Sequence, residues 1–401
     1  MGLKTDKLDR FAAVAASHVG DDKVPGLVAL VAQGDDVHVE ALGTLAVGGR
    51  PVARNSLFRI ASTTKPITAS ATLALAREGL LELDEPVVRL LPELANRRVL
   101  RRMDGPLEDT IAAIAPVTVR GLLTFTFGFG MALAMFMTPE PWPVIAAATD
   151  TGLATIGPPQ PDAFVDPDTW IARFGELPLL AQPGEKWLYH TGFDVLGVLL
   201  ARATGRPLPE VLAERVLRPL GMTDTGFQVP AASLHRLPAA YSPDPATGAP
   251  VLTDDPRDSL WGRPPAFPSA GGGLVSTADD LLAFCTMMLN KGRHGTDRVL
   301  SRPTVELMTT DLLTDQQKAE NEIFFGGNSG WGLGFQVFTR RTSLISTPGR
   351  FGWTGGTGTS VYTDPAEELI GILLTQREMT SPVPPEVFRD FWTCVYQAID
   401  D

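Results

Sequence analysis

The chain has 401 residues, of which 44% are hydrophobic and 20% charged, so it can bury a large core as one large domain or two closely packed ones. With 34 Lys and Arg against 46 Asp and Glu, the formal net charge is −12, which repels phosphate backbones and anionic lipid. These values argue against a nucleic-acid-binding or peripheral membrane protein. The chain has just two cysteines, Cys285 and Cys394, far apart and outside any Cys/His cluster, which excludes a disulfide scaffold and a thiolate metal site.

The first twenty residues lack the features of a secretory signal peptide. They carry charges through Arg10, followed by a short Ala/Val run that Ser17 and His18 interrupt. The most apolar stretch, residues 120–140, contains Gly128 and Gly130 and falls short of the roughly 20 apolar residues that a membrane span needs. We therefore expect a cytoplasmic protein, with residues 120–140 in its interior.

The chain opens with two β-rich runs within residues 24–47, separated by Gly34, Asp35 and Asp36, a pattern typical of an antiparallel hairpin. A helical pattern follows, in which Ile67, Ala71, Ala74 and Leu75 recur at helical spacing. Ser62 lies at the start of this segment and is predicted to be the helix N-cap.

Residues 85–330 contain helical patterns, including 193–204 and 277–290, joined by connections rich in Pro and Gly. From residue 331 short strand patterns return at 332–339, 358–363 and 368–375, before a closing helix near 385–399. The predicted fold is an antiparallel sheet flanked by helices. Residues 1–84 and 331–401 would form an α/β domain from both termini, with residues 85–330 as a mostly helical inserted domain.

One nucleophile motif is present, the SxxK tetrapeptide from Ser62 to Lys65. HExxH, the P-loop and GxSxG are missing from the sequence, which argues against metalloprotease, nucleotide-binding and α/β-hydrolase functions. On a helix, the SxxK spacing brings the Lys amine within hydrogen-bond reach of the Ser hydroxyl. A desolvated, neutral Lys65 could then take the proton of Ser62.

The sequence resembles the serine hydrolases of the class C β-lactamase and penicillin-binding-protein type, most of all the family VIII carboxylesterases. The resemblance runs through nearly the whole chain. It is carried, in order, by LFRIASTTKPITASATLALAREGLLELDEPV (57–87), VTVRGLLTFTFGFG (117–130), QPGEKWLYHTGFDVLGVLLARATGRPL (182–208), RPLGMTDTGF (218–227), SAGGGLVSTADDLLAF (269–284) and GWTGGTGTSVYTDP (352–365).

This resemblance implies a catalytic role for Tyr189, which occupies the tyrosine position of the family's YxN motif. As a phenolate, or as a phenol hydrogen-bonded to Lys65, it would move the proton between Ser62 and the leaving group. The alternative is a core tyrosine whose hydroxyl finds a backbone partner. The resemblance also implies an oxyanion hole at the backbone N–H groups of Ser62 and Gly356, and no metal or organic cofactor.

Two departures from the β-lactamase pattern bear on the substrate. Trp353 begins a Trp-Thr-Gly triplet where β-lactamases have KTG, and Thr191 replaces the Asn of their tyrosine motif. A Trp offers an apolar wall and at most one N–H donor, and a Thr hydroxyl reaches less far than an amide, so both changes weaken the recognition of β-lactams. Trp353, Thr191 and Gly355, a glycine that permits close backbone approach, are the predicted substrate-binding residues.

The function implied is a serine carboxylesterase that hydrolyses small, fairly apolar esters through an acyl-enzyme on Ser62. An acyltransferase, a weak β-lactamase or a D-aminopeptidase are alternatives on the same fold, and a non-catalytic penicillin-binding-like protein is a further one. Residues 131–143, rich in Met and aromatic residues, fit either an apolar pocket wall or a core helix. The expected partner is a small-molecule ester, with no nucleic acid and no membrane.

Overall fold

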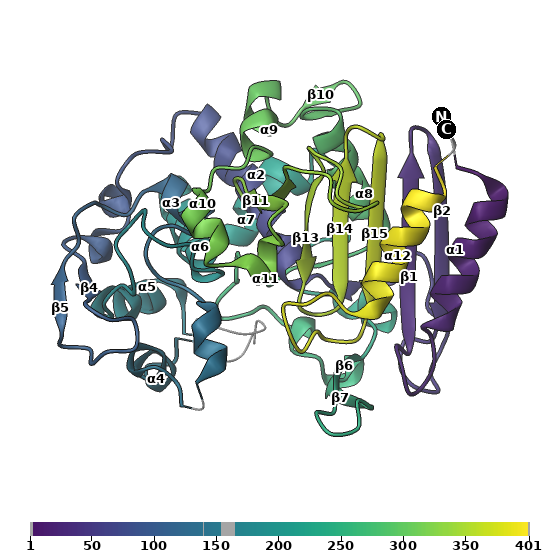
Figure 1. Cartoon of the computed structure of the whole chain (residues 1–401), viewed down its shortest axis with the longest axis horizontal. Helices are drawn as coiled ribbons and strands as arrows, with labels where there is room; N and C mark the ends of the chain where they lie inside the picture. The colour runs from purple at the N-terminus through teal and green to yellow at the C-terminus, as the bar shows by residue number, and fades with distance from the viewer. Residues whose placement is uncertain (1–2, 139, 154–164, 400–401) are drawn as a thin grey trace.

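The computed structural model describes residues 3–138, 140–153 and 165–399 (Figure 1). Its main layer is a seven-stranded antiparallel sheet in the order β11-β12-β13-β14-β15-β1-β2. These strands are β1 (Gly26–Gln33), β2 (Asp36–Gly43), β11 (Ser329–Trp331), β12 (Gln336–Phe338), β13 (Phe351–Gly355), β14 (Thr359–Asp364) and β15 (Leu369–Thr375). The antiparallel sheet and the hairpin within residues 24–47 are therefore as predicted.

Helices cover both faces of this sheet. The helices are α1 (Thr5–Ser17), α2 (Thr64–Arg77), α3 (Val119–Leu123), α4 (Pro143–Asp150), α5 (Pro167–Glu176), α6 (Thr191–Thr204), α7 (Leu208–Leu212), α8 (Ala278–Leu289), α9 (Arg302–Met308), α10 (Asp315–Ala319), α11 (Glu322–Phe325) and α12 (Glu386–Gln397). Helices α1 and α12 pack together on one face, and α8 packs against β14, β15 and β1 on the other (Figure 1). Every residue of β1 and β15 is buried as a result.

The apolar pattern of α12 explains how it docks. Val387, Phe391 and Val395 recur every fourth residue, so they lie along one stripe of the helix and are buried against the sheet. Beneath the helix, a Cβ atom on Gly371 of β15 would lie 2.4 Å from the ring of Trp392. Glycine at this position lets the helix approach the strand closely.

Part of the predicted helical insert belongs to the sheet layer. Helix α8 lies within residues 85–330 but packs on β14 and β15, whereas α2, from the N-terminal part, packs against α6 and α7. Residues 85–330 also contain strands paired in short two-stranded sheets. These are β4 (Arg98–Leu100), β5 (Thr110–Ala112), β6 (Ala240–Pro243), β7 (Pro250–Asp254), β9 (Arg293–His294) and β10 (Asp297–Arg298), while β8 (Val275–Ser276) pairs with β3 (Phe58–Arg59). The two-domain division stays a prediction.

The apolar stretch at residues 120–140 contributes to the core. Phe125, Phe127 and Phe129 are each at most 1% exposed, as the sequence predicts for an interior segment. Over the three ranges that the structure describes, no helix is both long enough and apolar enough to cross a membrane.

Candidate active site

Ser62 lies in a tight 3-10 turn that precedes α2. The turn spans Ala61–Thr63, and the N-cap of α2 is Thr63. The prediction that Ser62 caps the helix is therefore wrong by one residue, because the turn inserts an extra bend before the helix begins. The Ser62 hydroxyl instead accepts a hydrogen bond of 3.0 Å from Nζ of Lys65.

Strands β13 and β14 hold this turn in place. The hydroxyls of Thr63 and Thr359 lie 3.1 Å apart, and Thr359 also donates to the carbonyl of Ile60 at 3.2 Å. A Cβ atom on Gly355 would come within 2.4 Å of that same carbonyl, so the close approach requires glycine. Ala61 has a φ of 40°, a strained value for a residue with a side chain. The surrounding contacts thus fix the backbone that carries Ser62.

Lys65 is buried, with an exposed fraction of 0%. Burial lowers the pKa of its ammonium group to about 7, although the charge of Asp194 acts in the opposite direction. Besides Ser62, its Nζ donates to the carbonyl of Gly271 at 2.6 Å. At neutral pH a large fraction of Lys65 is therefore the free amine, the form that can accept a proton from Ser62.

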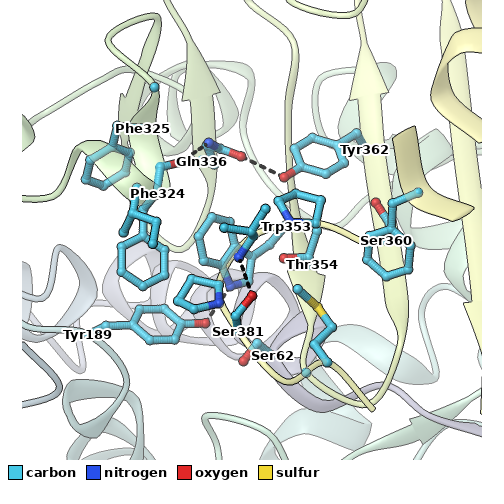
Figure 2. Close-up of a pocket in the computed structure, with 18 of the residues that line it drawn as sticks. Ser62, Tyr189, Phe324, Phe325, Gln336, Trp353, Thr354, Ser360, Tyr362 and Ser381 are labelled. Atoms are coloured by element: carbon cyan, nitrogen blue, oxygen red, sulfur yellow. Dashed lines mark hydrogen bonds between the residues drawn. The ribbon is translucent and has the colours of Figure 1, made fainter. Parts of the chain in front are cut away.

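Tyr189 lies beside Lys65 and Ser62. Its hydroxyl accepts a hydrogen bond of 2.5 Å from Nε1 of Trp353 (Figure 2). It is also hydrogen-bonded to Ser62. Nζ of Lys65 lies 4.7 Å from the centre of the tyrosine ring. Burial raises the pKa of Tyr189, and its hydrogen bonds with Ser62 and Trp353 offset this in part. Of the two forms considered from the sequence, the neutral phenol fits this environment and the phenolate does not.

Aromatic rings fix the position of Tyr189. The centres of Phe125, Trp187 and Trp353 lie 5.0, 5.5 and 5.6 Å from its ring centre. Its backbone also pairs with Met131 through two hydrogen bonds of 2.8 and 3.0 Å. Phe125 therefore forms part of the wall behind the tyrosine.

Two residues that the sequence analysis did not single out, His190 and Asp194, lie behind Lys65. Nδ1 of His190 is 3.3 Å from Nζ of Lys65, and Nε2 is 3.4 Å from Oδ2 of Asp194. A signal was present in the sequence, because a histidine directly follows the motif tyrosine and an aspartate follows four residues later, one helical turn away.

Ser62, Tyr189, Trp353 and Gly356 all line one cavity of about 750 Å³. Figure 2 shows Ser62 and Tyr189 near each other at one end of it, with Trp353 beside them, Phe324 next to Tyr189 and Tyr362 on the other side of Trp353. The wall is largely apolar and includes Met131, Ile323, Phe324, Phe325, Phe338, Ile345, Met379, Val383, Phe388 and Trp392.

Two predicted substrate-binding residues lie outside the cavity lining. Thr191 is fully buried at the first position of α6, and the cavity wall there is formed by His190. Gly355 packs against the turn before Ser62 instead. Neither residue is among those that line the cavity, and their role in substrate binding stays a prediction. Of residues 131–143, Met131 lines the cavity and Trp142 is buried, but residue 139 is outside the described part of the chain.

Across the described residues, no group of three or more His, Cys, Asp or Glu side chains could hold a metal ion. The arrangement is that of a serine hydroxyl, a desolvated amine within hydrogen-bond reach of it, and a phenol beside both, a set of groups suited to nucleophilic catalysis.

The family described as Beta-lactamase matches this chain over residues 11–388. The chain belongs to the β-lactamase family. This match confirms the resemblance to serine hydrolases that the sequence motifs indicate.

Several proteins are similar to this β-lactamase-family chain. It is 38% identical over 345 residues to an uncharacterized protein of Mycobacterium tuberculosis, covering 82% of this chain and 79% of the relative. It is 31% identical over 389 residues to esterase EstB of Burkholderia gladioli, covering 91% and 89%. The solved structure of EstCE1, described as a hydrolase with promiscuous acyltransferase activity, superposes with a TM-score of 0.79 at 24% identity and covers 97% and 98%, a likeness of fold.

Proposed function

We propose that this protein is a serine carboxylesterase that hydrolyses small, fairly apolar esters through an acyl-enzyme on Ser62. The observation that carries the proposal is the buried amine of Lys65, 3.0 Å from the Ser62 hydroxyl at the end of an apolar cavity. The similarity to a protein named esterase EstB supports the choice of an ester substrate.

In the acylation step, neutral Lys65 takes the proton of Ser62 while Oγ attacks the ester carbonyl carbon. The resulting oxyanion would accept hydrogen bonds from the backbone N–H groups of Ser62 and Gly356, both of which belong to residues that line the cavity. As the bond to the alkoxide breaks, the leaving oxygen takes a proton from the phenol of Tyr189, which Lys65 reprotonates. Water then repeats the sequence on the acyl-enzyme and releases the acid.

The environment of Tyr189 supports its role as a proton donor. Its pKa is raised, so the hydroxyl keeps its proton at neutral pH, and Trp353 donates to its oxygen and would stabilise negative charge that forms there. Trp353 would therefore serve catalysis through Tyr189, in addition to forming part of the apolar wall.

The test compares wild type and Ser62→Ala with a short p-nitrophenyl ester and with a chromogenic cephalosporin. We expect a burst of p-nitrophenol and an acyl adduct in the intact mass with the ester, both lost in the variant. Faster turnover of the cephalosporin than of the ester would overturn the choice of ester substrates. An adduct that persists in Ser62→Ala would overturn Ser62 as the nucleophile.

An acyltransferase is the second candidate, favoured by the size and apolar lining of the cavity, which has room for an acceptor alcohol beside the acyl group. Adding a short alcohol to the ester assay separates the two activities. An acyltransferase forms the transesterified product in preference to the free acid, even at low alcohol concentration. A carboxylesterase releases mainly the acid.

A further inference from the structure

His190 occupies a backbone conformation that proteins rarely adopt. Its φ of 82° and ψ of −66° are those of a classic γ-turn, closed by a hydrogen bond of 3.2 Å from the N–H of Thr191 to the carbonyl of Tyr189. Such strain persists only where surrounding contacts hold it, and it is concentrated at functional sites. The turn directs the imidazole of His190 toward Lys65 and away from solvent, with only 6% of the residue exposed.

Asp194 fixes the orientation of this ring. Its Oδ1 accepts hydrogen bonds from the Ser269 hydroxyl at 2.8 Å and from the N–H of Gly271 at 3.1 Å, and its Oδ2 faces Nε2 of His190. Burial would raise the pKa of Asp194, but the hydrogen bonds from His190, Ser269 and Gly271 prevail and lower it. An ionised carboxylate requires the proton of the neutral imidazole to be on Nε2, which leaves Nδ1 as an acceptor.

Asp194 thereby controls two of the contacts of Lys65. One is Nδ1 of His190. The other is the carbonyl of Gly271, a residue whose backbone N–H donates to Asp194. A neutral amine has two N–H groups and one lone pair. If its two N–H groups donate to Gly271 and His190, the lone pair has one polar neighbour left among the contacts of Nζ, the hydroxyl of Ser62.

We propose that His190, oriented by Asp194, is a positioning residue that directs the lone pair of the Lys65 amine onto the Ser62 hydroxyl. This inference rests on the proposed function and deepens it, because it assigns a role to the middle residue of the Tyr-His-Thr motif. The ring acts through Lys65 and takes no part in the bonds that form and break.

Protonation of His190 would reverse its effect. The titratable groups facing the ring are Lys65 from α2, Asp194 from α6 and the neighbouring Tyr189, while the 269–273 segment contributes the Ser269 hydroxyl and backbone groups. Burial and the charge of Lys65 lower the pKa of His190, against the opposing effect of Asp194. Below that pKa, Nδ1 becomes a donor and repels the lysine. Protonation of His190 would therefore add to the effect of protonating Lys65.

The experiment uses two variants that each retain one half of the imidazole. His190→Asn keeps an acceptor near Nδ1 but cannot reach Asp194, whereas His190→Gln keeps a donor near Nε2 but removes the acceptor beside Lys65. Acylation rate constants with the p-nitrophenyl ester are measured from pH 5.5 to 9, together with KM and the unfolding midpoint. His18→Gln, which alters the His18–Asp390 pair on the outer helices at 3.0 Å, is the control.

We expect His190→Gln to lower the acylation rate constant by roughly tenfold or more at unchanged KM, and His190→Asn to lower it less, since small errors of alignment are costly in proton transfer. A greater loss in Asn than in Gln, or a loss that appears in KM alone, would overturn the proposal. Wild type that forms no adduct on Ser62 would instead refute the proposed function.

Discussion

Replacing Lys65 by methionine should change the stability of the protein by an amount that depends on pH. The amine is buried and its pKa falls from 10.5 to about 7, so between these values the unfolded chain binds a proton that the folded protein does not. The free energy of unfolding of the wild type therefore rises with pH across this interval, by about 1.4 kcal/mol per pH unit. At pH 7.5 the uncharged state of Lys65 costs about 4 kcal/mol of stability, and Lys65→Met is free of that cost.

The assay is denaturant unfolding of wild type and Lys65→Met at pH 7.5 and 9.5. Wild type should gain about 2–3 kcal/mol relative to the variant between these two values. Changes in packing and in hydrogen bonds cancel from this difference, because they are the same at both pH values. Lys318→Met is the matched control, since the Asp311 carboxylate raises the pKa of Lys318 and both states keep that lysine protonated at pH 7.5. A stability difference that is the same at both pH values would refute the reasoning.

Two other substitutions address the cavity and the turn before Ser62. Trp353→Phe keeps an aromatic wall but removes the N–H donated to Tyr189. In steady-state ester hydrolysis it should lower kcat about five- to tenfold with little change in KM, as expected for the loss of one hydrogen bond of about 1 kcal/mol. A five- to tenfold rise in KM at unchanged kcat would indicate a role in binding instead. Gly355→Ala places a methyl group 2.4 Å from the carbonyl of Ile60 and should lower the free energy of unfolding, measured by thermal unfolding, by about 1–3 kcal/mol. Gly356→Ala is the control, because its Cβ meets no atom within 4 Å, and it should lower the stability far less. Equal losses of stability in the two variants would contradict this account.

The sequence predicts the sheet and its flanking helices well where local patterns and tertiary packing agree. The 277–290 prediction matches α8, and Thr277 caps it by accepting from the N–H of Asp280. Helix α1 is absent from the prediction, because its large apolar side chains, Leu8, Phe11 and Val14, are few and the rest of the segment is made mostly of charged residues and alanines. Its stability comes from packing against α12, which no local pattern reveals.

The site shows the same limit. Motifs identify Ser62, Lys65 and Tyr189, and the structure brings them together. They do not indicate which neighbours face the cavity, since Thr191 begins α6 and points into the core while His190, in a γ-turn, lines the cavity. A single residue with positive φ reverses the side that the following residues present, and propensity scales give little warning of such a conformation at a histidine.

The strand order has a consequence for synthesis on the ribosome. Strand β1 lies between β2 and β15, so one of its edges stays unpaired until residues 369–375 have been made. At synthesis rates of about 5–20 residues per second, that edge and its apolar residues are exposed for tens of seconds. The turn that carries Ser62 likewise packs against β13, so Ser62 cannot be aligned with Trp353 before translation is nearly complete. For most of its synthesis the nascent chain therefore lacks both the partner of β1 and the strand that completes the surroundings of Ser62.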